Sequence, residues 1–436
     1  MDDTFFWILW GVTLGLCGWK ILEGFRRPER MLEWPFIACT IWAYFYGYMA
    51  YEVKTLFSDY LPPGSFTLGA LMPLLCLVGI LWGWKLGTAG AASLQTQRRD
   101  YSLLQVWWLG VGLLLVGVIG SNVFSGFTDI AVNFENASGY SYLSFFAGYP
   151  GLTLAVWAAS KMSNGHRRLC WAMTVVGIVA FMYPFLFGGR RGPLFPTAMV
   201  LLILPALANR RAPNPLVFFT GLILAGLLML LCLQIRTTRS YTRSWSEVIS
   251  SLDIINAVQD RGREATDNEY LNNCALIAAA RQSGKYQYGS GHAGLLLHWI
   301  PRAWWPNKPA LGEGLYSHQE MFDEVESISG VRLIGGGAAA GGVADSYTQY
   351  GYFTPLFWFG LSWCIAKTFG RAKWGNDPRW LWAYAGIVCV SHWLISQGAA
   401  AAFVPGVVFV IVPLVASIVF RRIPHRTVPS PPTARP

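Results

Sequence analysis

Long apolar stretches with little charge recur along this 436-residue chain, and they constrain its fold more than any other feature. A bilayer core about 30 Å thick is crossed by a helix of around 20 mostly apolar residues. Charged residues make up 13% of the chain, against about 25% in soluble proteins. The sequence therefore predicts an all-α, polytopic integral membrane protein with about 11 (10–12) transmembrane helices. The eleven predicted spans are residues 5–22, 36–53, 66–86, 102–122, 142–160, 168–188, 193–209, 215–235, 352–369, 380–397 and 399–420.

The cysteines predict neither a disulfide framework nor a zinc site, because seven of the eight lie in apolar runs and no CxxC pair occurs. The first span follows Met1-Asp2-Asp3 without a basic region. It is therefore expected to be a retained span and not a cleaved signal.

Basic residues predict the orientation, because cytoplasmic loops of membrane proteins carry an excess of Lys and Arg. With the N-terminus outside, twenty of the 33 Lys and Arg lie on the inner side and three in short outer loops. The other ten lie in the long segment 236–351, which also holds 12 acidic residues and is expected to be external. The net charge of +10 is then a cytoplasmic charge beside anionic lipid, and no nucleic acid partner is expected.

The spans divide the chain into four parts: a first bundle of about eight spans (1–235), the external segment (236–351), the last three spans (352–421) and a disordered, cytoplasmic, proline-rich tail (422–436). In the external segment, Ser246–Gln259 and Asn268–Arg281 have helical periodicity. His292–Trp305 is apolar and rich in Trp, which suits a helix or re-entrant stretch at the membrane interface. Gly335–Gly342 predicts a flexible, close-packing stretch.

Arginines on the outer side are the first candidates for a binding site. Arg190 and Arg191 form a glycine-flanked turn between two spans, where the charge rule does not place cations. A guanidinium matches phosphate oxygens bidentately, and the alternative is snorkelling to lipid headgroups. Arg236, Arg239 and Arg243 follow the eighth span on one helix face, as a second phosphate contact or as headgroup anchors.

The stretch Ile300–Pro309 is the most distinctive part of the external segment. Arg302 and Lys308 supply cations, and Trp304 and Trp305 offer flat faces for sugar rings. Its three prolines fix the backbone. A glycan-binding loop and an ordinary interfacial loop are both compatible with this composition.

The external candidates for a general base are His292, His298, His318, Glu313 and Asp345. For Asp345, the structural alternative is that it caps the helix it begins. In the middle of the spans, His392 is the one clear ionisable residue, and a buried neutral role is the simpler interpretation. A proton- or sodium-coupled transporter would be expected to keep carboxylates at mid-membrane, which argues against that class.

Three of these pieces together resemble a known family. They are the turn Gly189–Gly192, the stretch Ile300–Pro309 and the closing segment Gly341–Gly351. The combination is similar to bacterial oligosaccharide repeat-unit polymerases, the Wzy-type O-antigen and exopolysaccharide polymerases.

The resemblance implies a metal-independent membrane glycosyltransferase without a cofactor. Such enzymes transfer a glycan from undecaprenyl pyrophosphate to another lipid-linked repeat unit at the external face of the cytoplasmic membrane. Arg190, Arg191 and Arg302 would contact the pyrophosphate with support from Lys308, and His292 or Asp345 would be the base. Flippase and chain-length or export proteins of the same pathway are the implied partners. The alternatives are an O-antigen ligase, a lipid-linked oligosaccharide transporter or flippase, and a non-catalytic export component.

Overall fold

The computed structural model describes residues 2–89, 101–126, 147–187, 194–241, 268–297, 340–374 and 377–419, and a few single positions between 304 and 327. The described residues form helices and hold no β-strand, as the sequence predicted. The helices are α1 (Asp2–Arg26), α2 (Trp34–Trp42), α3 (Met49–Leu56), α4 (Ser65–Thr88), α5 (Leu103–Gly126), α7 (Tyr149–Lys161), α8 (Asn164–Phe187), α9 (Leu194–Asn209), α10 (Pro215–Tyr241), α13 (Glu269–Ser283), α14 (Ser290–Leu296), α16 (Gly342–Tyr350), α17 (Thr354–Trp374), α18 (Pro378–Ser396) and α19 (Ala399–Val419).

In the described residues, each of the eleven predicted apolar stretches overlaps a helix or two joined helices. By length and composition, three helices in the described residues are able to cross a membrane: Asp3–Arg26, Ser65–Thr88 and Leu103–Gly120. Shorter apolar helices cover Leu194–Asn209, Pro215–Met229 and Ala399–Ile411. The all-helical class is thus confirmed, together with a set of apolar helices suited to a membrane.

Two predicted spans differ in detail from a simple helix. In the second, α2 and α3 are joined by the π-helical stretch Ala43–Tyr48, so the helix continues with a local widening. In the fifth, Pro150 does not interrupt a helix, since α7 begins at Tyr149 and Pro150 occupies its first turn. Proline is tolerated there because the first N–H groups of a helix have no intrahelical partner.

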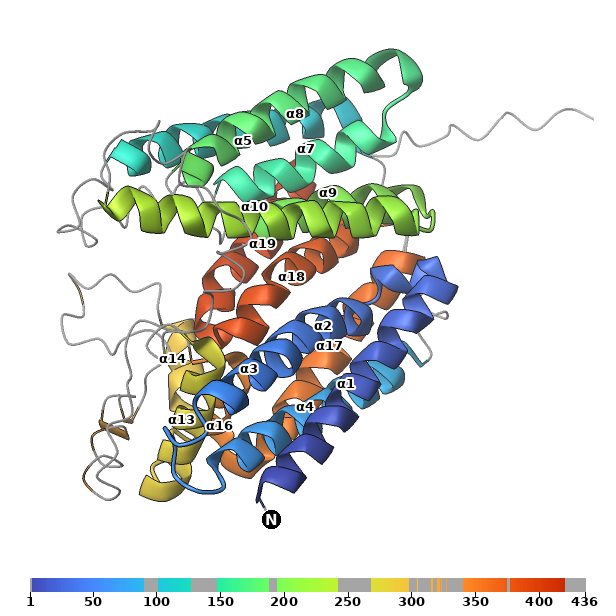
Figure 1. Ribbon diagram of the computed structural model, residues 1–436. Coiled ribbons are helices and arrows are strands. Elements are labelled where there is room, and N and C mark those ends of the chain that lie inside the picture. Colours follow the sequence, from blue (N-terminus) through green and yellow to red (C-terminus); the bar gives the residue numbers. More distant parts are fainter. Residues whose placement is uncertain are drawn as a thin grey trace, which may run out of the picture.

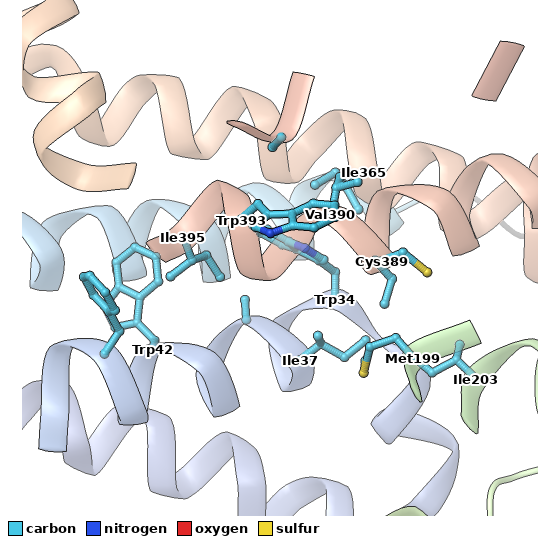
Figure 2. Close-up of a cluster of buried hydrophobic side chains, with 14 of the residues drawn as sticks. Trp34, Ile37, Trp42, Met199, Ile203, Ile365, Cys389, Val390, Trp393 and Ile395 are labelled. Atoms are coloured by element: carbon cyan, nitrogen blue, oxygen red, sulfur yellow. The ribbon is translucent and has the colours of Figure 1, made fainter. Parts of the chain in front are cut away.

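The helices pack into an elongated bundle (Figure 1). α5, α7 and α8 form one group, α1, α2, α4 and α17 form another, and α9, α18 and α19 lie between them. Figure 2 shows part of the core, where α2, α9, α17 and α18 meet around Trp34, Met199 and Trp393. The Trp34 indole is fully buried and donates a hydrogen bond of 2.8 Å to Ser391 Oγ. The buried tryptophan thus keeps its polar atom satisfied.

Glycines allow the closest helix pair, α4 and α17, to touch along its length. Gly79, Gly83 and Gly87 recur every four residues, so they share one face of α4. A Cβ atom at Gly79 would lie 2.6 Å from the carbonyl oxygen of Pro355, and one at Gly83 would overlap the carbonyl of Phe359. Small residues at this spacing let membrane helices approach backbone to backbone. The pair forms a rigid base from which α16 extends.

The described parts of segment 236–351 pack onto the helical bundle. α13 begins as the periodicity predicted, with the Asn268 side chain accepting hydrogen bonds of 3.0 and 3.1 Å from the N–H groups of Tyr270 and Leu271. It lies against α3 and α4, and Cys274 is buried beside Gly69. The predicted helix Ser246–Gln259 lies outside the described residues.

The predicted stretch His292–Trp305 is described only at residues 292–297 and at Trp304. The helix at this place, α14, begins at Ser290 and ends at Leu296, where the N–H of Leu297 closes the last turn onto Gly294. Trp304 is 82% exposed. α13, α14 and α16 gather at one end of the bundle (Figure 1), and the candidate site lies there.

Candidate functional site

The site is built on α16, which is fixed by side chains from two distant elements. The N–H of Val343 donates to Tyr46 Oη at 3.2 Å, and the N–H of Ala344 donates to Asn273 Oδ1 at 3.0 Å. These bonds satisfy N–H groups of the first turn that have no partner within the helix. Gly341, at φ +83°, makes the turn into α16 next to Asn273. The position of Asp345 is thereby set by the packing of α13 and the α2–α3 helix.

Hydrogen bonds connect the start of α14, and the residues just before it, to the last turn of α16. Gln349 Oε1 accepts hydrogen bonds from the N–H groups of Gly291, at 3.0 Å, and His292, at 3.4 Å. The backbone adds two more, from Gln287 N–H to Thr348 O at 2.8 Å and from Gly289 N–H to Gln349 O at 3.1 Å. Gln349 thus acts as the N-terminal cap of α14 from another helix and fixes the direction of the His292 side chain.

This arrangement brings together the two residues that the sequence suggested as bases. His292 Nε2 lies 3.2 Å from Asp345 Oδ2, and His292 Nδ1 lies 3.0 Å from Tyr350 Oη. The side chains of His292 and Asp345 are 10% and 6% exposed. The Tyr350 ring stacks on Phe357, with 5.3 Å between centroids, and His292 packs on the same phenylalanine. We call Asp345, His292 and Tyr350 the relay triad.

Asp345 does not cap its own helix, contrary to the structural alternative. The residue preceding α16 is Gly341, and Asp345 lies within the first turn. Its Oδ2 instead accepts a hydrogen bond of 2.7 Å from the N–H of Ala399, the first residue of α19. Gly398, at φ +109°, makes the approach possible, because a Cβ atom there would lie 2.8 Å from Oδ2. The Asp345 carboxylate thus lies against the N-terminal end of α19.

The polar contacts imply an order of protons along the triad. An ionised Asp345 accepts the proton of His292 Nε2, which leaves the lone pair on Nδ1 to accept from the Tyr350 hydroxyl. Burial and the negative charge of Asp345 both raise the pKa of Tyr350, so its hydroxyl stays protonated. A carboxylate that orients an imidazole, which in turn accepts a proton from a hydroxyl, is the arrangement of a general-base relay.

The helix that follows the predicted arginine turn, α9, packs on α18. The turn containing Arg190 and Arg191 lies outside the described residues, between α8 and α9. The ring of Phe195, at the start of α9, stacks on His392 of α18, with 4.9 Å between centroids. His392 lies one turn before the end of α18 at Ser396, and Gln397 and Gly398 connect α18 to Ala399 at the start of α19. The stacking also agrees with a structural role for His392.

The remaining predicted site residues fall partly outside the described part of the chain. Arg236 and Arg239 lie in the last turns of α10, which ends at Tyr241, and their side chains are not described. Cys232 of α10 is adjacent to Leu186, which lies at the C-terminal end of α8. The last turns of α10 and the C-terminal end of α8 therefore lie at the same end of the bundle. Arg302, Trp305 and Lys308 lie outside the described residues, as do His298, Glu313 and His318.

Sequence reasoning missed Tyr350 and Gln349. Both lie in the segment that carried the family resemblance, but neither received a role. One signal was present: Asp345 and Gln349 are four residues apart and therefore share a helix face.

Comparison with known proteins yields no relative. No family model, no curated protein and no solved structure matches the chain.

Proposed function

We propose that this protein is a membrane glycosyltransferase that polymerises undecaprenyl-pyrophosphate-linked oligosaccharide repeat units into O-antigen or exopolysaccharide. The observation that carries the proposal is the relay triad, in which a buried carboxylate, a partly buried imidazole and a partly buried phenol form a hydrogen-bonded chain at one end of a bundle of apolar helices. Such a chain suits the deprotonation of an acceptor hydroxyl, the step that a glycosyl transfer to a sugar requires.

In the proposed reaction, the acceptor hydroxyl oxygen forms a bond to the anomeric carbon of the donor glycan. The bond from that carbon to the pyrophosphate oxygen breaks, and its electron pair stays on the leaving pyrophosphate. The hydroxyl proton passes to His292 Nδ1, directly or through Tyr350, and Asp345 stabilises the resulting imidazolium.

Cations near the triad would stabilise the pyrophosphate as it leaves. Negative charge grows on this group in the transition state, so fixed guanidiniums stabilise it more than they stabilise the ground state. Arg190 and Arg191 are the proposed contacts, and the support is that α9, which follows them in the chain, packs through Phe195 on α18. Arg302 and Lys308 follow α14 in the chain, and α14 carries His292. Trp304 and Trp305, in the same stretch, would stack on sugar rings.

The proposal includes eleven membrane crossings with the N-terminus, segment 236–351 and the relay triad on the external side of the bacterial cytoplasmic membrane. It predicts the accessibility of two exposed serines, Ser58 between α3 and α4 and Ser163 between α7 and α8. In a Cys364→Ser background, a membrane-impermeant maleimide should label Ser58→Cys in intact cells or spheroplasts and label Ser163→Cys only after lysis. The reverse pattern, or equal labelling of both, would refute this orientation.

The proposed function is tested by the polymer intermediates that accumulate in a null strain. These intermediates also distinguish a polymerase from a ligase. Loss of a polymerase should leave single repeat units on lipid carrier or core, whereas loss of a ligase should leave long chains on the carrier. Gels of surface polymer and extracted lipid-linked glycans distinguish these results. A null strain with an unchanged pattern of both pools would exclude polymerase and ligase alike, and repeat units trapped on the cytoplasmic side would favour a flippase.

A further inference from the structure

A second polar site lies at the opposite end of α4 and α17 from the relay triad. It is a cleft of about 740 Å³ between the C-terminal ends of α1, α4 and α17 and the start of α2. α4 has 24 residues, so this cleft is separated from the α16 end by roughly 36 Å along the helix. The proposed glycan chemistry makes no use of it. Its volume is within the range of about 300–1,000 Å³ of small-molecule sites.

Four cationic side chains line the cleft, against two carboxylates. The cations are Lys20, Arg30, Lys85 and Lys373, and the carboxylates are Glu23 and Glu33.

One carboxylate is already neutralised by two of the cations. Glu23 accepts from Lys20 at 2.7 Å and also pairs with Arg30. In the described part of the chain, neither Lys85 nor Lys373 forms an ion pair with a carboxylate. Lys373 Nζ lies 5.3 Å from the ring centroid of Trp374, within reach of a cation–π contact. Two ammonium groups in the cleft are thus available to an anion.

The second carboxylate, Glu33, does not balance the remaining charge, because four cations face two carboxylates in the cleft. Burial is the largest influence on Glu33 and raises the pKa of its carboxyl, although Lys373, Arg30 and Lys20 oppose the shift. The cleft therefore keeps an excess of positive charge.

The mouth of the cleft is lined by exposed aromatic rings. Trp19, Trp82 and Trp374 are 56%, 60% and 53% exposed. Two of the helices best suited to cross a membrane, α1 and α4, end here. Tryptophan concentrates where the hydrocarbon core meets the headgroups. An opening with these rings at the end of two apolar helices lies at headgroup depth.

We infer that this cleft binds the phosphate headgroup of an anionic phospholipid, with Lys85 and Lys373 as the phosphate contacts. The acyl chains would leave the cleft between the exposed tryptophans, along the apolar surfaces of α1 and α4. Basic pockets between membrane helices bind anionic headgroups in this way, and the predicted orientation puts this cleft in the cytoplasmic leaflet. The inference does not depend on the glycosyltransferase proposal, and its test measures no activity.

Lipid-dependent thermal stability of the purified full-length protein tests the inference. The protein in neutral detergent is titrated with phosphatidylglycerol, phosphatidylcholine or inorganic phosphate while Tm is followed. A ligand that binds only the folded state raises Tm in a saturable way. We expect phosphatidylglycerol to do so at lower concentration than the other two, and the Lys85→Gln and Lys373→Gln variants each to raise its half-maximal concentration about tenfold.

Lys161→Gln is the matched control, since Lys161 is an exposed lysine on the same predicted side of the membrane but outside the cleft. It should respond to phosphatidylglycerol like the wild type, and Lys373→Arg should retain most of the response. Lys85 is exposed, so Lys85→Gln tests the inference even if Lys373→Gln does not fold. An unchanged titration in Lys85→Gln, or an equal response to phosphatidylcholine, would overturn the inference. If inorganic phosphate raised Tm as strongly as the lipid does, the cleft would bind a free anion, and the assignment to a lipid headgroup would be overturned.

Discussion

Asp345→Asn is expected to abolish long surface polymer while the protein remains in the membrane at its normal amount. The asparagine oxygen can still accept the Ala399 N–H that Asp345 Oδ2 binds at 2.7 Å, so the start of α19 stays capped. A neutral amide cannot stabilise an imidazolium at His292, however. General-base catalysis contributes about 10²–10⁴-fold to a rate, and a loss of this size leaves little or no long polymer. His292→Gln should have the same effect.

The chain provides a matched control for this substitution at Asp377. This carboxylate is also buried, with 3% side-chain exposure, and it caps the start of α18 by accepting from the N–H of Arg379 at 3.1 Å. Asp377→Asn therefore repeats the chemical change at a second buried helix start, away from the relay triad. Gels of surface polymer, with immunoblots of the membrane fraction, compare the two variants in the null strain. Full-length polymer from Asp345→Asn, or equal losses in the two variants at equal protein levels, would contradict the catalytic role.

Tyr350→Phe tells which group receives the acceptor proton. The ring keeps its stacking on Phe357, so only the hydroxyl 3.0 Å from His292 Nδ1 is lost. If the proton travels through Tyr350, polymer should fall nearly as far as in His292→Gln. If the acceptor hydroxyl contacts His292 itself, polymer length should change little.

Individual helices of this fold could be predicted from the sequence because apolar length is a local property. The start of α13 is an example, since Asn268 ahead of an acidic first turn is a local capping signal and the structure uses it. Membrane crossing is harder to predict. α7 has 13 residues, which is about 20 Å and less than a bilayer core, although the apolar stretch around it is longer.

Two members of the relay triad, His292 and Asp345, could be predicted from the sequence, but Tyr350 and the contact between the three residues could not. His292 and Asp345 are 53 positions apart, and no periodicity connects them. Their contact depends on Gln349 holding the start of α14, on Asn273 and Tyr46 fixing α16, and on Gly398 leaving room for the carboxylate. Each of these is a tertiary contact between elements distant in sequence. The same reason explains why capping of its own helix was left as an alternative role for Asp345.

Arg190→Ala and Arg191→Ala should each shorten or eliminate the surface polymer, and the double variant should leave only single repeat units. The reason is electrostatic: a fixed donor to the developing charge contributes about 10²–10³-fold in comparable sites, and two adjacent guanidiniums would act on one pyrophosphate. The neighbouring helix ends support this location, because Phe195 at the start of α9 packs on α18, whose successor helix α19 contacts Asp345.

Arg167 and Arg168 provide the matched control for the arginine turn. They are also adjacent, exposed and near the end of α8, but at the opposite, N-terminal end. Arg167→Ala/Arg168→Ala removes the same charge from the predicted cytoplasmic side, so it should leave polymer length unchanged if the protein still inserts correctly. Lysine at both outer positions should restore part of the polymer, because an ammonium supplies the charge but not the bidentate geometry. Long polymer from Arg190→Ala/Arg191→Ala at normal protein levels would eliminate these arginines as pyrophosphate contacts. An equal loss from both pairs would point instead to a general need for surface arginine in membrane insertion.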